Sequence, residues 1–164
     1  ALKVLQDWLT THPGDLTVLR YLAETYLSIN RTTEAKEVYE KIVGLYPNHV
    51  QTLNNLAWLV RDDNRQQAIA YAERAYELQP NNPQVLDTLG MLLLDGADAS
   101  RGHGLIREAA NNVPDNLQIQ LHLAQSLLQQ QRYSAAKETL RSIIAKAKDD
   151  PIAVKANELL TTIP

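Results

Sequence analysis

A proline returns at nearly constant spacing along this chain. Pro13, Pro47, Pro80 and Pro114 are separated by 34, 33 and 34 positions. Proline lacks a backbone N–H and disfavours helical backbone in the residue before it, so each one ends the amphipathic segment that precedes it. A fixed period of this length predicts a repeat architecture built from copies of one small unit.

Two helices are predicted in each period, and the first begins three residues after the proline, at Leu16, Val50, Pro83 and Leu117. Counted from that start, positions 4, 7, 8 and 11 form one apolar stripe, because spacings of three and four fall on one helical face. Gln120 breaks the pattern at position 4, where the other repeats have leucine. Position 8 is always small, which lets two helix backbones approach closely; it holds Ala23, Ala57, Gly90 and Ala124.

The second helix of each period also has a small residue at a fixed place. Position 20 holds Ala35, Ala68, Gly102 and Ala136, with the second repeat one residue short. Polar residues follow the prolines as predicted turn and N-cap residues, namely Asn48, Asn81–Asn82 and Asp115–Asn116. The sequence Gly102-His103-Gly104 predicts a loose start to its helix, because each glycine weakens a helix by about 1 kcal/mol relative to alanine.

This pattern of small and aliphatic positions ending in proline resembles the tetratricopeptide repeat (TPR), over nearly the whole chain. The resemblance implies an all-α TPR solenoid, a right-handed superhelix of antiparallel helix pairs with about ten helices. We expect one TPR domain over residues 1–164, with full repeats at 14–47, 48–80, 81–114 and 115–148. Residues 1–13 are then the second helix of a truncated repeat, and residues 151–163 a terminal capping helix. Because the chain begins within a repeat and without Met, we expect a fragment of a longer array.

Trp8 occupies position 27 of the truncated repeat, which is normally a buried position. We therefore expect Trp8 in the core, against Leu19 and Tyr26. The same end of the chain is expected to expose apolar surface that favours self-association.

The composition excludes several function classes. A net charge of −3 gives no overall attraction to nucleic acid. No apolar stretch is long enough to cross a bilayer, and the absence of cysteine excludes disulfides and thiolate metal sites. The four histidines lie in different repeats without ligand spacing, and no nucleophile, base and acid converge. We therefore predict no catalytic residue, no cofactor and no metal.

In TPR arrays the first helices line a concave groove, and positions 2, 5, 9, 12 and 13 face into it. Carried onto this chain, the resemblance implies a partner-binding groove that includes Arg20, Glu24, Asn54, Trp58, Arg61, Gln84, Asp87, Met91 and Gln125. The third repeat has Gln84, Asp87 and Thr88 where a clamp for a C-terminal carboxylate needs basic residues. This absence disfavours binding of the chaperone type.

Trp58 and Met91 hold the same groove position in successive repeats, so we expect them to be neighbours. Tryptophan is enriched among residues that supply binding energy, so Trp58 is a candidate contact for a partner. The alternative is that Trp58 only packs against its own neighbours and fills a gap between repeats. The sequence leaves both interpretations open.

A narrower resemblance comes from the strings LNNLAW at 53–58, LDTLG at 86–90 and HLA at 122–124, preceded by LQDWL at 5–9. They resemble the C-terminal repeats of bacterial envelope TPR lipoproteins found with exosortase (PEP-CTERM) and exopolysaccharide systems. This resemblance implies a periplasmic or outer-membrane-associated scaffold for polysaccharide export or protein sorting, with the cytoplasm as the alternative location.

Three functions remain open at this point. The first is a scaffold that binds a protein or peptide in the groove. The second is a module that binds polysaccharide directly, with Trp58 stacking on sugars and the groove glutamines and carboxylates forming hydrogen bonds. The third is a structural spacer without a groove ligand. An enzyme, nucleic-acid binding and membrane insertion are all disfavoured.

Overall fold

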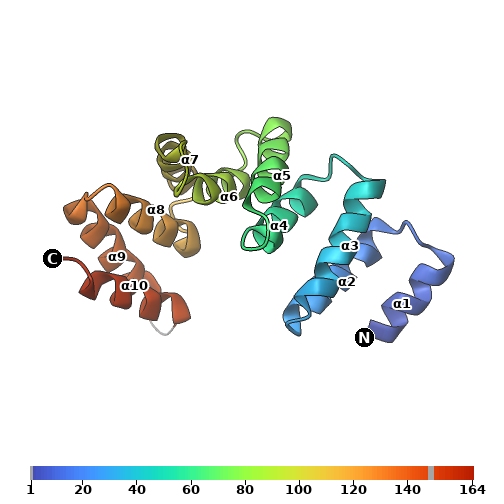
Figure 1. Cartoon of the computed structure of the whole chain (residues 1–164). Helices are drawn as coiled ribbons and strands as arrows, with labels where there is room; N and C mark the ends of the chain where they lie inside the picture. The colour runs from blue at the N-terminus through green and yellow to red at the C-terminus, as the bar shows by residue number, and fades with distance from the viewer. Residues whose placement is uncertain (1, 148–149) are drawn as a thin grey trace. The chain divides into compact units, whose positions relative to one another are not determined.

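The computed structural model describes residues 2–147 and 150–164, and these contain ten helices and no strand (Figure 1). The all-α fold predicted from the sequence is confirmed. The helices are α1 (Leu2–Thr11), α2 (Leu16–Ser28), α3 (Thr32–Leu45), α4 (Val50–Val60), α5 (Arg65–Leu78), α6 (Pro83–Leu93), α7 (Ala99–Asn112), α8 (Leu117–Gln129), α9 (Tyr133–Ala147) and α10 (Pro151–Thr161). The predicted end of the fourth repeat at residue 148 and the predicted helical position of residue 1 lie outside the described residues.

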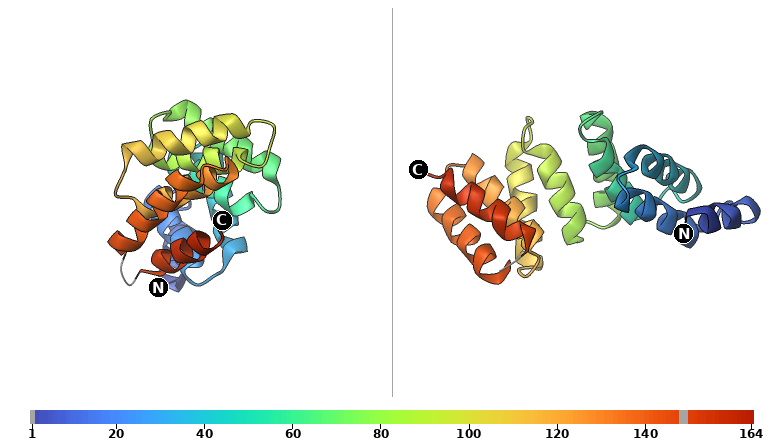
Figure 2. Two further views of the ribbon diagram at one scale, coloured as in Figure 1. Left: turned by 90° about the vertical axis from the view of Figure 1, so that its left-hand side faces the viewer. Right: turned by 90° about the horizontal axis from the view of Figure 1, so that it is seen from below.

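The chain forms two compact units, unit 1 (residues 1–80) and unit 2 (residues 81–164), divided where the second repeat was predicted to end. Unit 1 contains α1 to α5 and unit 2 contains α6 to α10. Within each unit, successive helices pack against each other and run in alternating directions, as the two views of Figure 2 show. The first helices of the predicted pairs are α2 and α4 in unit 1, and α6 and α8 in unit 2.

These four first helices begin at the residues that the proline spacing predicts. Their starts are held by side chains that accept hydrogen bonds from backbone N–H groups that have no partner within the helix. The side chains of Asp15, Asn82 and Asn116 do this for α2, α6 and α8. At α4 the N-cap is His49, whose Nδ1 atom accepts from the backbone N of Thr52 at 3.3 Å, and Asn48 lies in the turn before it.

The core of unit 1 forms between α2, α3 and α4, around Leu19, Tyr39 and Ile42. Helix α1 packs onto this core through Leu9, and its Leu5 packs against a second cluster that contains Leu22 and Tyr26. The prediction that Trp8 is buried against Leu19 and Tyr26 is wrong, because Trp8 is 47% exposed. Its ring stacks on His12 with centroids 4.1 Å apart, and its indole N–H donates to Asp15 at 3.0 Å.

A close approach of α6 and α7 distinguishes unit 2. A Cβ atom added to Gly90 would lie 2.6 Å from Cγ1 of Ile106. One added to Gly102 would lie 2.7 Å from the carbonyl oxygen of Gly90. Gly102 is buried in this contact, one turn inside α7, so the prediction of a loose helix start at this position is wrong.

Gln120, the exception at position 4, has a specific contact. Its side-chain amide donates to the carbonyl oxygen of Ala110 at 2.9 Å. Ala110 lies in the last turn of α7, where carbonyl groups lack partners within the helix. The glutamine therefore replaces apolar packing with a hydrogen bond that joins α8 to the end of the preceding helix.

Candidate functional site

The predicted groove residues lie on the first helices of the two units or directly after them, and they differ in exposure. Asp87 is buried, whereas the predicted groove position implied a side chain facing solvent. Glu24, Arg61 and Gln84 are exposed. The remaining predicted site residues are partly buried: Arg20, Asn54, Trp58, Met91 and Gln125. Trp58 belongs to unit 1 and Met91 to unit 2.

On α2, the side chains of Arg20 and Glu24 form an ion pair with 3.7 Å between Nη2 and Oε1. Both are substantially exposed, so the pair contributes little to stability. They line a pocket of about 330 Å³ with Leu5 of α1 and with Thr17, Val18 and Tyr21 of α2. Arg20 also affects His49, the N-cap of α4. The pKa of His49 is held below its usual value mainly by burial and, to a smaller extent, by the positive charge of Arg20.

On α4, Trp58 is partly covered by Arg61, which follows the helix. The guanidinium carbon lies over the indole ring, 4.6 Å from its centroid, in a cation–π contact. Arg61 also donates to the carbonyl oxygen of Trp58 at 3.1 Å and approaches Asp62 at 3.5 Å. One face of the indole ring is therefore occupied by a residue of the chain itself.

Asn54 and Asn55 precede this tryptophan on α4 and have different environments. Asn55 donates from Nδ2 to the hydroxyl of Tyr39 at 3.0 Å, and burial raises the pKa of Tyr39. The side-chain oxygen of Asn54 is buried and has no hydrogen-bond partner within the described part of the chain. An oxygen in that state can accept a hydrogen bond from a bound molecule.

On the first helices of unit 2, Asp87 forms a buried pair with His122. Its Oδ2 atom lies 2.7 Å from Nδ1 of His122, and the amide nitrogen of Gln118 lies 2.8 Å from Nε2 of the same ring. A ring that carries a proton on Nδ1 donates it to the Asp87 carboxylate. Burial raises the pKa of Asp87, and the hydrogen bond and charge of His122 oppose that rise.

A second contact joins the same two helices further along. The Gln129 amide donates to Asp95, the second residue after α6, at 3.2 Å. We call the two pairs, Asp87–His122 and Asp95–Gln129, the polar ladder. Met91 lies between the two aspartates on the α6 side, and Gln125 lies between His122 and Gln129 on α8, because residues three and four apart share a helical face.

Three buried side-chain oxygens in the described residues have no hydrogen-bond partner: Oδ1 of Asn54, Oδ1 of Asp87 and Oε1 of Gln125. All three belong to the groove set implied by the repeat positions. An unpaired buried polar group costs about 1–3 kcal/mol, so it is normally satisfied by water or by a ligand. Their shared place on first helices marks these surfaces as the candidate site.

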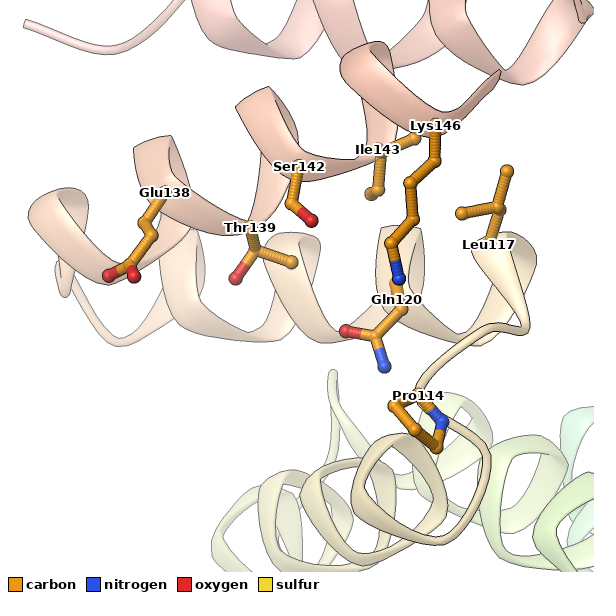
Figure 3. Close-up of a pocket in the computed structure, with 8 residues that line it drawn as sticks. All are labelled: Pro114, Leu117, Gln120, Glu138, Thr139, Ser142, Ile143 and Lys146. Carbon is orange, nitrogen blue, oxygen red and sulfur yellow. The ribbon is translucent and has the colours of Figure 1, made fainter.

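A different hollow of about 210 Å³ lies between α8 and α9 (Figure 3). Its polar groups mostly bond within the chain. Lys146 pairs with Asp115 at 2.9 Å, Gln120 donates to Ala110, and Thr139 donates to the carbonyl oxygen of Ala135. This hollow therefore offers fewer unused polar groups than the first-helix surfaces do.

Within residues 2–147 and 150–164, no group of three or more histidine and carboxylate side chains is arranged to hold a metal ion. The helices of the described part were also searched for membrane spans, and none has the length and apolar character to cross a bilayer.

The stacked helix pairs, with a small residue at each close crossing, define a helical-repeat protein. A family model described as "Tetratricopeptide repeat" matches residues 17–49. A second, described as "Anaphase-promoting complex, cyclosome, subunit 3", matches residues 62–143, which is half of the chain. The chain belongs to the tetratricopeptide repeat family.

Solved structures share this fold at low sequence identity. The TPR protein TTC0263 of Thermus thermophilus has a TM-score of 0.80 and 18% identity over 98% of this chain and 89% of that one. MamA from Desulfovibrio magneticus RS-1, residue 41 to the end, has a TM-score of 0.72 and 18% identity over 90% of this chain and 85% of that one. YrrB, described as a TPR protein with an unusual peptide-binding site, has a TM-score of 0.69 and 12% identity over 99% of this chain and 93% of that one. No curated protein sequence matches the chain.

Proposed function

We propose that this chain is a non-catalytic scaffold that binds a protein partner, as an extended segment or a helix, through its first-helix surfaces. The observation that supports this most directly is the set of unpartnered oxygens on Asn54, Asp87 and Gln125, all within the described residues. A polypeptide supplies N–H donors at regular intervals, which such acceptors require. YrrB, which shares the fold, is described as having a peptide-binding site, and this supports the same choice.

Direct polysaccharide binding is less well supported by the same contacts. Sugar stacking requires a free aromatic face, and Arg61 covers one of the two faces of Trp58, so at most one face can stack on a sugar. The glutamines and carboxylates of the surface serve a peptide as well as a sugar. We therefore favour a peptide as the ligand and treat an oligosaccharide as the competing probe.

The narrower proposal is that the scaffold serves a bacterial envelope system for exopolysaccharide synthesis and export or for protein sorting. It rests on the resemblance of residues 53–58, 86–90 and 122–124 to envelope TPR lipoproteins. It assigns the protein to the periplasm or the outer membrane. Affinity capture from a bacterial envelope extract, followed by identification of the captured proteins, tests this. Capture of components unrelated to either system contradicts it.

The scaffold proposal is tested by selecting peptides from a random display library against the intact chain. Affinities are then measured by fluorescence anisotropy for wild type, Asn54→Ala, Trp58→Ala and the control Lys41→Ala, an exposed residue of α3. We expect both first-helix variants to weaken binding by at least about tenfold, as substitutions at binding hot spots do. The control should bind as wild type does.

Circular dichroism separates binding from packing in this experiment. If Trp58→Ala lowers the helicity or the melting temperature of the protein, then Trp58 is a packing residue. In that case the affinity of Asn54→Ala alone tests the scaffold proposal. Equal affinity in all variants would place recognition on another surface. Failure to select any peptide, together with saturable binding of an oligosaccharide, would favour the polysaccharide module.

A further inference from the structure

The polar ladder of unit 2 combines negative charge with an absence of basic residues on its two helices. Helices α6 and α8 contain no lysine or arginine, and their ionisable residues are Asp87 and His122. Asp95 adds a second carboxylate directly after α6. This surface therefore contains two carboxylates, and its two helices contain no lysine or arginine.

Asp87 uses only one of its two carboxylate oxygens. Oδ2 is bonded to His122, whereas Oδ1 is buried and has no hydrogen-bond partner within the described residues. The side chain is only 8% exposed. A buried carboxylate gains most from a partner that is itself a cation and a donor, since charge-assisted hydrogen bonds are roughly twice as strong as neutral ones.

Gln125 supplies a second acceptor on α8, the helix that also carries His122. It lies one turn beyond His122 on α8, and its buried Oε1 atom also has no partner within residues 2–147 and 150–164. Met91, one turn beyond Asp87 on α6, is partly exposed. Two acceptors beside a flexible apolar side chain fit a group with a charged end and a methylene stem.

We propose that this surface binds a lysine or arginine side chain of the partner peptide, with Asp87 Oδ1 and Gln125 Oε1 as the acceptors. This inference rests on the scaffold function proposed above and specifies the chemistry of its partner. An ammonium offers three donors and a guanidinium five, so either has enough donors for both oxygens. Met91 packs against the methylene stem.

The test uses degenerate nonapeptide libraries, each with one fixed central residue: lysine, arginine, citrulline, norleucine or glutamate. Citrulline keeps N–H donors without the charge, and norleucine keeps the stem without either. The intact chain is immobilised, and retention of each library is measured by mass spectrometry. We expect the lysine and arginine libraries to be retained at least about tenfold more than the other three, which corresponds to about 1.4 kcal/mol.

Two substitutions then locate the preference. Asp87→Asn keeps an oxygen for His122 but removes the charge, and should abolish the preference for basic peptides. Gln125→Glu adds a charge beside the same site and should increase that preference. Glu108→Gln, on the exposed side of α7 in the same unit, is the control and should leave it unchanged.

The outcomes separate this inference from the scaffold proposal. Peptides that bind without a preference for basic residues, or a preference that survives Asp87→Asn, would overturn the cation site and leave the scaffold standing. No retention of any library would overturn both. If Asp87→Asn fails to fold, Gln125→Glu provides the test of the cation site. An unchanged preference for basic peptides in that variant contradicts the site.

Discussion

The second and third repeats fill the same two close-contact positions in different ways. In the second repeat, Ala57 of α4 and Ala68 of α5 are fully buried. In the third, Gly90 and Gly102 bring α6 and α7 so close that a methyl group at either position would meet atoms nearer than 3 Å. One repeat pattern therefore contains two kinds of packing, with buried methyl groups at these positions in one pair of helices and a close backbone approach in the other.

The strongest test of this comparison is Gly102→Ala. The new methyl group would meet the carbonyl oxygen of Gly90 at 2.7 Å and Cβ of Leu93 at 3.1 Å, so the helices themselves must move apart. Overpacking of this kind costs about 1–3 kcal/mol, and a backbone obstacle places the effect at the upper end, about 3 kcal/mol. Chemical denaturation of both proteins measures the loss. A variant as stable as wild type would show that the contact yields easily.

Gly90→Ala should have a smaller effect, about 2 kcal/mol, because its nearest obstacle is a side-chain atom, Cγ1 of Ile106. A double-mutant cycle identifies that obstacle. In an Ile106→Ala background the cost of Gly90→Ala should fall by about 1 kcal/mol, since residues in contact are coupled. Strict additivity of the two changes would mean that Ile106 is not what excludes the methyl group.

The reverse substitution in the second repeat is Ala68→Gly. It removes a buried methyl group and adds helix-disfavouring flexibility, so we expect the free energy of unfolding to fall by about 1 kcal/mol. The same denaturation experiment measures it. If glycine at this position were neutral or stabilising, the second repeat would accept the backbone contact of the third, and the distinction between the two repeats would fail.

The smallest expected effect concerns the helix starts of the same two repeats. Helix α4 is capped by His49, whose pKa is lowered by burial and by Arg20, whereas α6 is capped by Asn82, which does not titrate. Because the folded-state pKa is lower, the unfolded chain binds the proton more readily. The cap's contribution is present above the unfolded pKa of about 6.5 and is lost as the pH falls through the folded pKa.

A histidine-to-asparagine substitution at position 49 provides the comparison. Measured between about pH 7.5 and 5, a window that spans the ordinary histidine pKa, wild type should lose more stability than His49→Asn. The difference should be less than the roughly 1 kcal/mol that an N-cap contributes. Parallel pH curves for the two proteins would contradict a titrating cap at α4.

The fold was largely predictable because its signals are local. Proline and the polar residues after it set the starts of α2, α4, α6 and α8 to the residue. Trp8 shows where the repeat numbering fails. The stripe of α1 that packs on the rest of unit 1 runs through Leu5 and Leu9, and Trp8 lies beside it. Its indole N–H donates instead to Asp15, seven residues away, a contact that periodicity does not encode.

The site was predictable only as a set of positions. Its chemistry depends on pairs separated by about one repeat, such as Asp87 with His122 and Asp95 with Gln129. A groove position read by itself gives no information about the residue opposite. For the same reason Gly102 taken alone predicts a weak helix start, although the glycine at position 8 of the same repeat indicates that the two helices approach closely.

The contacts of the third repeat also bear on how such an array can be lengthened by copying one of its units. The contact between Gly90 and Gly102 lies inside one repeat, so a tandem duplication of residues 81–114 would preserve it in each copy. The pair of Asp87 and His122 instead crosses into the following repeat. In a duplicated array, the aspartate of the upstream copy would face the residue that holds the same repeat position as His122, which is Thr88.

Threonine is too short to take the place of an imidazole ring, and the buried carboxylate of the upstream copy would lose its partner. A buried charge without a partner is strongly destabilising. A duplication of the third repeat at this point would therefore destabilise the array unless a compensating substitution accompanied it.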